Sequence, residues 1–490
     1  MPDVKQRNNI HLLWRTGFGP SVSQLKSIND HSYKHIWNNL VKTSAKELQP
    51  YNTIDNYLMG IMADAGTPAK LMKKEMSVAE KKMIREKNSQ SIADLNLQWV
   101  NDMVNSEAQL REKVAFFWHG HFACRSLSAL YQQQLLNTVR SNAIGNFRRL
   151  LFAVSKSAAM INFLNNNQNR KNHPNENFAR EVMELFTLGR GNYTEQDVKE
   201  AARAFTGWGA NAKGEFIFRK QQHDGSIKKF LGRTGNFNGD DILNILLEQK
   251  QTAVFITQKI YRFFVNENVD DDKVQDLANT FYKSGYDIQQ LLSNIFLSNW
   301  FYEVKNTGTR IKSPIELIVG IQRMLPMEVE NKNFFLLVQR VLGQLLMYPP
   351  NVAGWPGGKS WIDSSTLMMR MRLPEILSEA DTFNIKPKDD DDQMMGIKDN
   401  ELKVAAKPRK KKNNVSEKEV NTRIGWNEYL LFFNKIKKED LTTTIAGLLL
   451  QTNNAVSTEL IKKYSVIDSR EQFIKTATIQ IMSMPEYQVC

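Results

Sequence analysis

The stretch at residues 176–207, ENFAREVMELFTLGRGNYTEQDVKEAARAFTG, contains two helix patterns separated by a short turn. Apolar residues recur at helical spacing over 176–188 and again after Thr194. Thr194 and Asp197 resemble a capping box with Asp in place of Glu, and Gly207 is typical of the residue that closes a helix. The stretch therefore predicts two consecutive helices.

The helical pattern continues on both sides of this stretch. Apolar residues recur at helical spacing in most segments, which start with Ser, Thr, Asp or Asn and stop at Gly or Pro. Besides the helix at 176–188, the candidate helices cover residues 78–107, 109–119, 129–142, 195–206, 239–248, 252–265, 271–283, 286–298, 313–325, 333–345 and 364–377. We therefore expect a mostly α, large multi-helix globular domain.

One segment departs from the helical pattern. The sequence GEFIFRKQQHDGSIKKFLG alternates apolar and polar residues on both sides of Asp224-Gly225, a strong short-range turn signal. The pattern predicts one small β-hairpin near 215–231.

The composition is that of an ordinary globular protein. Of 490 residues, 41% are hydrophobic and 24% are charged. No run approaches the roughly 20 apolar residues of a membrane span, and no signal peptide is visible, so the expected location is the cytoplasm. Cys124 and Cys490 are the only cysteines, which argues against a disulfide framework.

The formal net charge of +13 could suit an acidic partner. Part of this charge is concentrated in the run KPRKKK at 407–412. No zinc-finger spacing, aromatic RNA-binding signature or phosphate-binding loop accompanies it. A solvated basic surface is therefore the preferred interpretation, and nucleic acid is not the expected partner.

The charged segment at 385–424 divides the chain. It combines DDDD, KPRKKKNN and SEKE with almost no aromatic residues, which is typical of a flexible linker or insertion. We predict a main helical domain at 1–384, the linker at 385–424, and C-terminal helices at 425–490 that dock on the main domain.

The segment FFWHGHFACR contributes a histidine pair, His119 and His121. The two side chains diverge by about 200° on a regular helix, but a helix end at Gly120 would let both rings face one cavity. They are then candidate ligands of a divalent metal ion, although zinc needs at least one further ligand. The alternative is that the surrounding aromatic residues form core and the histidines hydrogen-bond within it.

The helix predicted at 176–188 carries a polar stripe. Asn177, Glu181 and Glu184 fall within an arc of about 80°. Neighbouring carboxylates repel and can raise one pKa, so the stripe could ligate a cation or supply a general acid and base. The alternative is a solvated helix face paired with Arg180.

His223 and Asp224 are adjacent at the predicted hairpin tip. A tight turn could present both side chains for proton transfer. Equally, Asp224 and Gly225 could serve only the turn.

The segment YPPNVAGWPGGKSWI contains Trp355 and Trp361 in a backbone rich in Pro and Gly. Two indoles on a rigid loop could form a flat platform that stacks a sugar or a base. It could also be a buried loop that crosses between helices.

These segments resemble a bacterial family, the domain of unknown function 1800. The similarity rests on FFWHGHFACR, AIGNFRRLLFAVSKSAAMINFLNNN, PNENFAREVMELFTLGRGNYTEQDVKEAARAFTGW, HDGSIKKFLGRTGNFNGDD and PPNVAGWPGGKSWI, and weaker similarity covers nearly the whole chain. The resemblance brings no established activity. Many members of this family look exported, and the resemblance suggests a sulfatase-like protein encoded nearby as a partner.

The motifs together suggest an enzyme, with hydrolysis of an anionic or sugar-containing substrate as the leading hypothesis. The predicted catalytic residues are Glu181, Glu184, His223 and Asp224, the predicted metal ligands are His119 and His121, and the predicted substrate-binding residues are Asn177, Arg180, Trp208 and Trp355. The alternative is a non-catalytic scaffold, or a protein that binds a glycan or a partner. An enzyme requires these side chains in one cleft, whereas a scaffold would bury them in separate paired networks.

Overall fold

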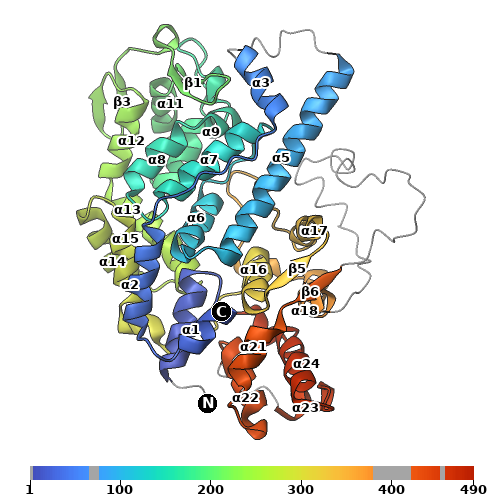
Figure 1. Ribbon diagram of the computed structural model, residues 1–490. Coiled ribbons are helices and arrows are strands. Elements are labelled where there is room, and N and C mark those ends of the chain that lie inside the picture. Colours follow the sequence, from blue (N-terminus) through green and yellow to red (C-terminus); the bar gives the residue numbers. More distant parts are fainter. Residues whose placement is uncertain (1–3, 66–76, 379–420, 453–457) are drawn as a thin grey trace.

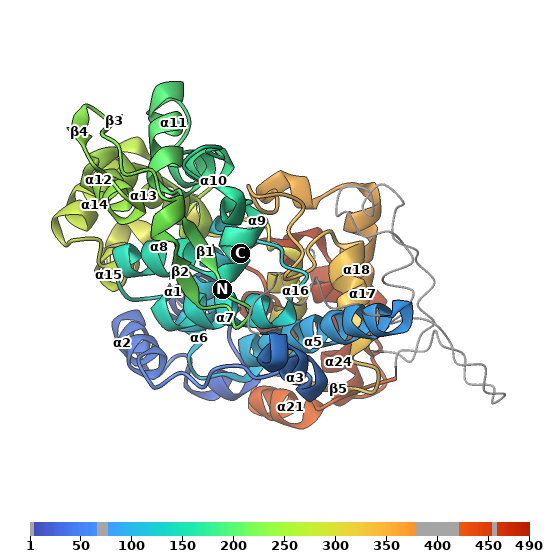
Figure 2. The ribbon, with the colours of Figure 1, turned by 90° about the horizontal axis from the view of Figure 1, so that it is seen from above.

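The long helix α5 (Val78–Asn105) is the element against which helices from distant parts of the chain pack. The computed structural model describes residues 4–65, 77–378, 421–452 and 458–490. The helix begins at a capping box, in which Glu80 N–H donates to Ser77 Oγ and Ser77 N–H donates to Glu80 Oε2. Its 28 residues extend about 42 Å. Helices α6, α7, α16 and α17 contact it (Figures 1 and 2).

Helices make up most of the described chain, which confirms the predicted fold class. The helices that precede β1 are α1 (Val4–Thr16), α2 (Tyr33–Ser44), α3 (Asn56–Ala65), α5, α6 (Gln109–His121), α7 (Ala129–Asn142), α8 (Phe147–Ser155), α9 (Ala158–Phe163), α10 (Asn177–Glu181) and α11 (Glu195–Ala204). The middle of the chain forms α12 (Gly239–Glu248), α13 (Lys250–Phe264), α14 (Asp271–Lys283), α15 (Ile288–Phe296), α16 (Pro314–Met324), α17 (Asn333–Val341) and α18 (Ser364–Ser378). The last helices are α21 (Trp426–Phe433), α22 (Leu441–Leu449), α23 (Thr458–Tyr464) and α24 (Arg470–Met482).

The β-structure of the described residues is limited to three two-stranded antiparallel sheets. They pair β1 (Trp208–Ala210) with β2 (Phe216–Phe218), β3 (Lys228–Phe230) with β4 (Arg233–Gly235), and β5 (Met327–Val329) with β6 (Thr422–Ile424).

The hairpin predicted across Asp224-Gly225 would pair β2 with β3. In the structure, β2 pairs with β1 and β3 pairs with β4. Asp224 accepts from Arg203 Nε and from Ser226 N–H, so contacts with α11 hold this segment.

The buried apolar side chains of the described residues form one continuous cluster that includes the C-terminal helices. Helix α24 packs on α18, and α21 packs on the 3₁₀ helix η1 (Val22–Ser27). Strand β6, at the end of the predicted 385–424 linker, pairs with β5; the preceding residues 379–420 lie outside the described chain. The division at 384 and 425 stays a prediction.

The N-terminal helix is fixed by hydrogen bonds to residues far along the sequence. Arg15, fully buried, donates from Nη2 to the main-chain oxygens of Asn306 at 3.0 Å and Cys490 at 2.8 Å. Figure 1 shows the C-terminus close to α1.

The described helices do not meet the requirements of a membrane span. None of them combines the length and the apolar character that crossing a bilayer demands.

Candidate functional site

A cavity of about 560 Å³ opens between the end of α6, helix α13 and the loop that carries Trp355. We call it the basic cavity, and its polar and aromatic lining includes His121, Lys259, Arg262, Phe263, Glu267, Arg310, Trp355 and Trp361. Its size lies within the range of about 300–1,000 Å³ that is usual for small-molecule sites. Three basic side chains and one carboxylate line it, so an anionic ligand is electrostatically favoured.

Lys259 and His121 form a close pair in the basic cavity. Lys259 Nζ lies 3.4 Å from His121 Nδ1 and donates to the main-chain oxygen of Leu185 at 3.2 Å. Burial, together with the nearby Arg262 guanidinium, lowers the pKa of Lys259 to about 8. Burial and the charge of Lys259 lower the pKa of His121 well below its usual value, so the imidazole is neutral at neutral pH. Lys259 can therefore exchange a proton close to neutral pH.

Arg310 connects the cavity to a buried charge cluster. Its Nη1 lies 3.5 Å from Glu316 Oε1, and its guanidinium lies over the Phe263 ring at 4.7 Å from the centroid. Glu316 in turn accepts from Lys113 Nζ at 2.5 Å. These contacts hold Arg310 in place at the cavity wall.

The loop that carries Trp355 packs directly on the end of α6. Gly354 has φ +86°, and a Cβ there would lie 2.5 Å from the main-chain oxygen of Gly120. A glycine is required because a side chain would meet backbone in a left-handed conformation. The buried Nε1 of Trp355 has no hydrogen-bond acceptor among the described residues.

His119 supports this loop from the side. Its Nε2 accepts from the Met347 N–H at 3.3 Å, and its ring lies 5.3 Å from Trp355 and 5.1 Å from Trp99, centroid to centroid. Burial lowers the pKa of His119 to about 3. The ring is therefore neutral and holds the loop in position.

The predicted metal pair does not acquire a third ligand in the described part of the chain. No group of three or more His, Cys, Asp and Glu side chains suited to a metal ion occurs among residues 4–65, 77–378, 421–452 and 458–490. His121 faces Lys259 and Phe186, whereas His119 faces Met347. Metal binding by His119 and His121 stays a prediction.

The predicted helix at 176–188 is an α-helix followed by a π-helix (Val182–Thr187). Thr187 Oγ1 donates to the oxygen of Val182 at 2.7 Å, which satisfies a carbonyl in the wider turn. Such π-segments are frequent at functional sites. Leu185 of this segment accepts from Lys259, so the π-helix lies against the basic cavity.

The acidic stripe of this segment makes separate contacts. Glu184 accepts from Tyr193 Oη at 2.6 Å and from Arg190, and these bonds lower its pKa. Burial and the charge of Glu184 raise the pKa of half-buried Glu181. Neither carboxylate lines the basic cavity.

Arg180 and Asn177 of the same segment make contacts within the surrounding structure. Arg180 Nη2 pairs with Glu195 at 2.7 Å and with Glu176 at 3.2 Å. Asn177 Nδ2 donates to the oxygen of Leu164 at 3.3 Å. Neither side chain lines the basic cavity, so a role in binding substrate stays a prediction.

His223 and Asp224 lie together beside the end of α11. His223 Nδ1 lies 3.0 Å from the oxygen of Thr206, and Asp224 N–H donates to Thr206 Oγ1 at 2.8 Å. Burial alone would raise the pKa of Asp224, but hydrogen bonds from Arg203 and Ser226 lower it to about 2. The ion pair between Asp224 and Arg203 gives Asp224 a structural role.

Trp208, predicted to contact substrate, is 3% exposed and lies among aromatic rings. Phe205 and Phe216 contact it edge to face at 5.1 and 5.2 Å. Its substrate-binding role stays a prediction.

The structure thus brings together His121 and Trp355 of the predicted residues, and adds Lys259, Arg262 and Arg310, which the sequence analysis missed. Lys259 and Arg262 are three residues apart on α13, which places two cations on one helix face. This spacing was the available signal.

The fold and the cavity define a mostly helical protein with a basic, aromatic-lined site. The chain belongs to the family described as Protein of unknown function (DUF1800), whose model matches residues 11–489. No curated protein matches the chain, and no solved structure does either.

Proposed function

We propose that the protein binds a small anionic substrate in the basic cavity and acts on it hydrolytically. The observation that supports this proposal is the contact of 3.4 Å between Lys259 Nζ and His121 Nδ1, in a cavity that Arg262 and Arg310 also line. An anionic group would pair with Arg262 and Arg310, while a ring of the substrate would pack on Trp355.

In the proposed reaction water adds to the acyl, phosphoryl or sulfuryl centre, and the bond to the leaving oxygen breaks. The Lys259 ammonium gives its proton to that oxygen, and the attacking water returns a proton to the Lys259 amine, whose Nζ lies 3.4 Å from His121 Nδ1. A pKa of about 8 suits this role, because the group loses its proton readily but is mostly charged at neutral pH.

Binding of inorganic phosphate and sulfate, measured by calorimetry, tests the site. We expect Lys259→Met to weaken anion binding at least about tenfold, which is about 1.4 kcal/mol. Lys250→Met is the matched control, because Lys250 is exposed at the start of the same helix. The affinity of the wild type should fall as the pH rises through about 8, where Lys259 loses its charge. Equal binding by all three proteins would contradict the proposal.

Hydrolysis is tested with three anionic esters, nitrophenyl phosphate, nitrophenyl sulfate and the mono-nitrophenyl ester of succinate. Turnover of one of these by the wild type and Lys250→Met, with loss in Lys259→Met, is the expected result. Anion binding without turnover of any of them would leave the cavity as a binding site and reject hydrolysis of these ester classes.

A second candidate function, a scaffold or partner-binding protein, is favoured by the ion pairs of the motif residues. Arg180 pairs with Glu195, and Arg203 with Asp224, in networks outside the basic cavity. Loss of stability without loss of anion binding in Asp224→Asn would support a structural role for this motif.

A further inference from the structure

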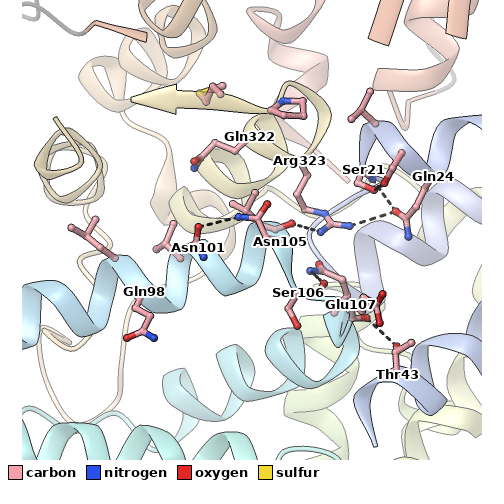
Figure 3. Close-up of a pocket in the computed structure, with 18 of the residues that line it drawn as sticks. Ser21, Gln24, Thr43, Gln98, Asn101, Asn105, Ser106, Glu107, Gln322 and Arg323 are labelled. Atoms are coloured by element: carbon pink, nitrogen blue, oxygen red, sulfur yellow. Dashed lines mark hydrogen bonds between the residues drawn. The ribbon is translucent and has the colours of Figure 1, made fainter. Parts of the chain in front are cut away.

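A second and larger concavity of about 1330 Å³ is lined by residues of α5 and β5 and, beside them, of η1, α2 and α16. We call it the polar groove, and the lining residues used below are Gln98, Asn101, Asn105, Gln322, Met327 and Val329. Figure 3 shows Asn101 and Asn105 on α5 close to Gln322 and Arg323. The basic cavity shares no lining residue with it.

One wall of the polar groove is a row of carboxamides on α5. Gln98, Asn101 and Asn105 recur at spacings of three and four residues, so they share one helix face. All three are exposed, and Asn105 Nδ2 donates to Asn101 Oδ1 at 3.0 Å. Each carboxamide offers both donors and acceptors, which is the pattern that a peptide backbone requires.

The opposite wall is the free edge of β5. The Gly425 N–H donates to Pro326 and the Glu330 N–H donates to Asn421, so alternate residues of this strand bond to β6. By the alternation of an antiparallel pair, the main-chain groups of Met327 and Val329 point to the other edge. Their sheet has two strands in the described chain, and β5 but not β6 lines the groove.

The two walls match in length. From Gln98 to Asn105 the helix rises about 10 Å, and three residues of extended chain span about the same distance. One added strand could therefore bond to β5 on one side and to the carboxamides on the other.

The charge of the groove argues for a polypeptide. Four basic and four acidic side chains line it, so it carries no net charge and does not select a nucleic acid or an anionic polymer. Phe335 is the one aromatic residue among the described lining and is 7% exposed, so no ring is offered for stacking a sugar. We propose that the polar groove binds an extended segment of a partner polypeptide as a third strand beside β5.

The test uses a phage-displayed library of random peptides of about ten residues, long enough to cross the groove. Selected peptides are synthesised, and their binding to the full chain is measured by fluorescence anisotropy. Val329→Pro removes an N–H from the free edge without removing a bond to β6, and an edge strand tolerates proline there. Val329→Ala is the matched control, because it shortens the same side chain and keeps the N–H.

We expect selected peptides to bind Val329→Ala within about threefold of the wild type and Val329→Pro at least about tenfold more weakly. Asn101→Leu should also weaken binding. Failure to select any peptide, equal binding to the proline and alanine variants, or binding of cellohexaose in place of peptides would overturn the proposal.

Site-resolved hydrogen–deuterium exchange of the wild-type chain gives a measurement that does not depend on how the variants fold. A bound peptide should slow exchange of the Met327 and Val329 amides, whereas the Glu328 amide, already paired with β6, should change little. Unchanged exchange at both free-edge amides would refute strand addition.

Discussion

Glu316 is the acidic centre of a buried charge cluster, and its removal should destabilise the protein strongly. Its side chain and that of Lys113 are both 0% exposed, with Lys113 Nζ 2.5 Å from Oε1. Arg310 lies 3.5 Å from the same oxygen, and the Ser313 N–H donates to Oε2 at 2.7 Å. Burial alone would raise the pKa of Glu316, but the charges of Lys113 and Arg310 hold it well below its usual value.

We expect Glu316→Gln to lower the free energy of unfolding by about 3–5 kcal/mol, because Lys113 is left buried without a counter-charge. The assay is urea unfolding followed by tryptophan fluorescence. The matched control is Glu195→Gln, whose side chain is 70% exposed where it pairs with Arg180. That surface pair should contribute at most about 1 kcal/mol.

The reasoning is refuted if Glu316→Gln costs no more than Glu195→Gln. The pH dependence has a definite sign. Since folding lowers the pKa of Glu316, its contribution is present above the unfolded pKa and is lost as the pH falls toward the folded value.

Two further predictions concern the backbone and the buried histidines. Gly207→Ala should cost more than Gly191→Ala in the same unfolding assay, since both have positive φ (+82° and +85°) but a Cβ at Gly207 would lie 2.7 Å from the Arg219 oxygen. The left-handed conformation alone costs about 1–2 kcal/mol. Equal losses of stability in the two variants would therefore contradict the clash with the Arg219 oxygen. Burial lowers the pKa of His119 to about 3. As the pH falls below the ordinary pKa of histidine, His119 therefore takes up a proton in the unfolded chain but not in the folded chain. His119 should therefore account for about 2 kcal/mol of lost stability between pH 7 and 5, and an unchanged slope in His119→Gln would count against this.

Local sequence patterns predicted many of the helices, but not α1, α2, α3, α8 or α9. The helices predicted at 129–142, 239–248 and 271–283 have these bounds in the structure. The helix α1 was not predicted, because it buries polar residues such as Asn9 and Arg15 along with apolar ones and so lacks a clean periodic pattern. The π-helix was missed because its wider turn depends on hydrogen bonds that spacing does not reveal.

The candidate site was only partly predictable. His121 and Trp355 were singled out from their segments, and both line the basic cavity. Lys259 was missed because it meets His121 across 138 residues of sequence. Side chains that far apart are brought together by packing of whole helices, which helical periodicity does not specify.

The bonds from Arg15 to Asn306 and Cys490 set an order of events during protein synthesis. Arg15 of helix α1 is synthesised 475 positions before one of its buried partners, the oxygen of residue 490. Contacts of such sequence separation form only after long loops have closed. Helix α1 therefore reaches its final environment late, and until residue 490 has been synthesised the nascent chain carries a guanidinium that lacks one of its two buried partners.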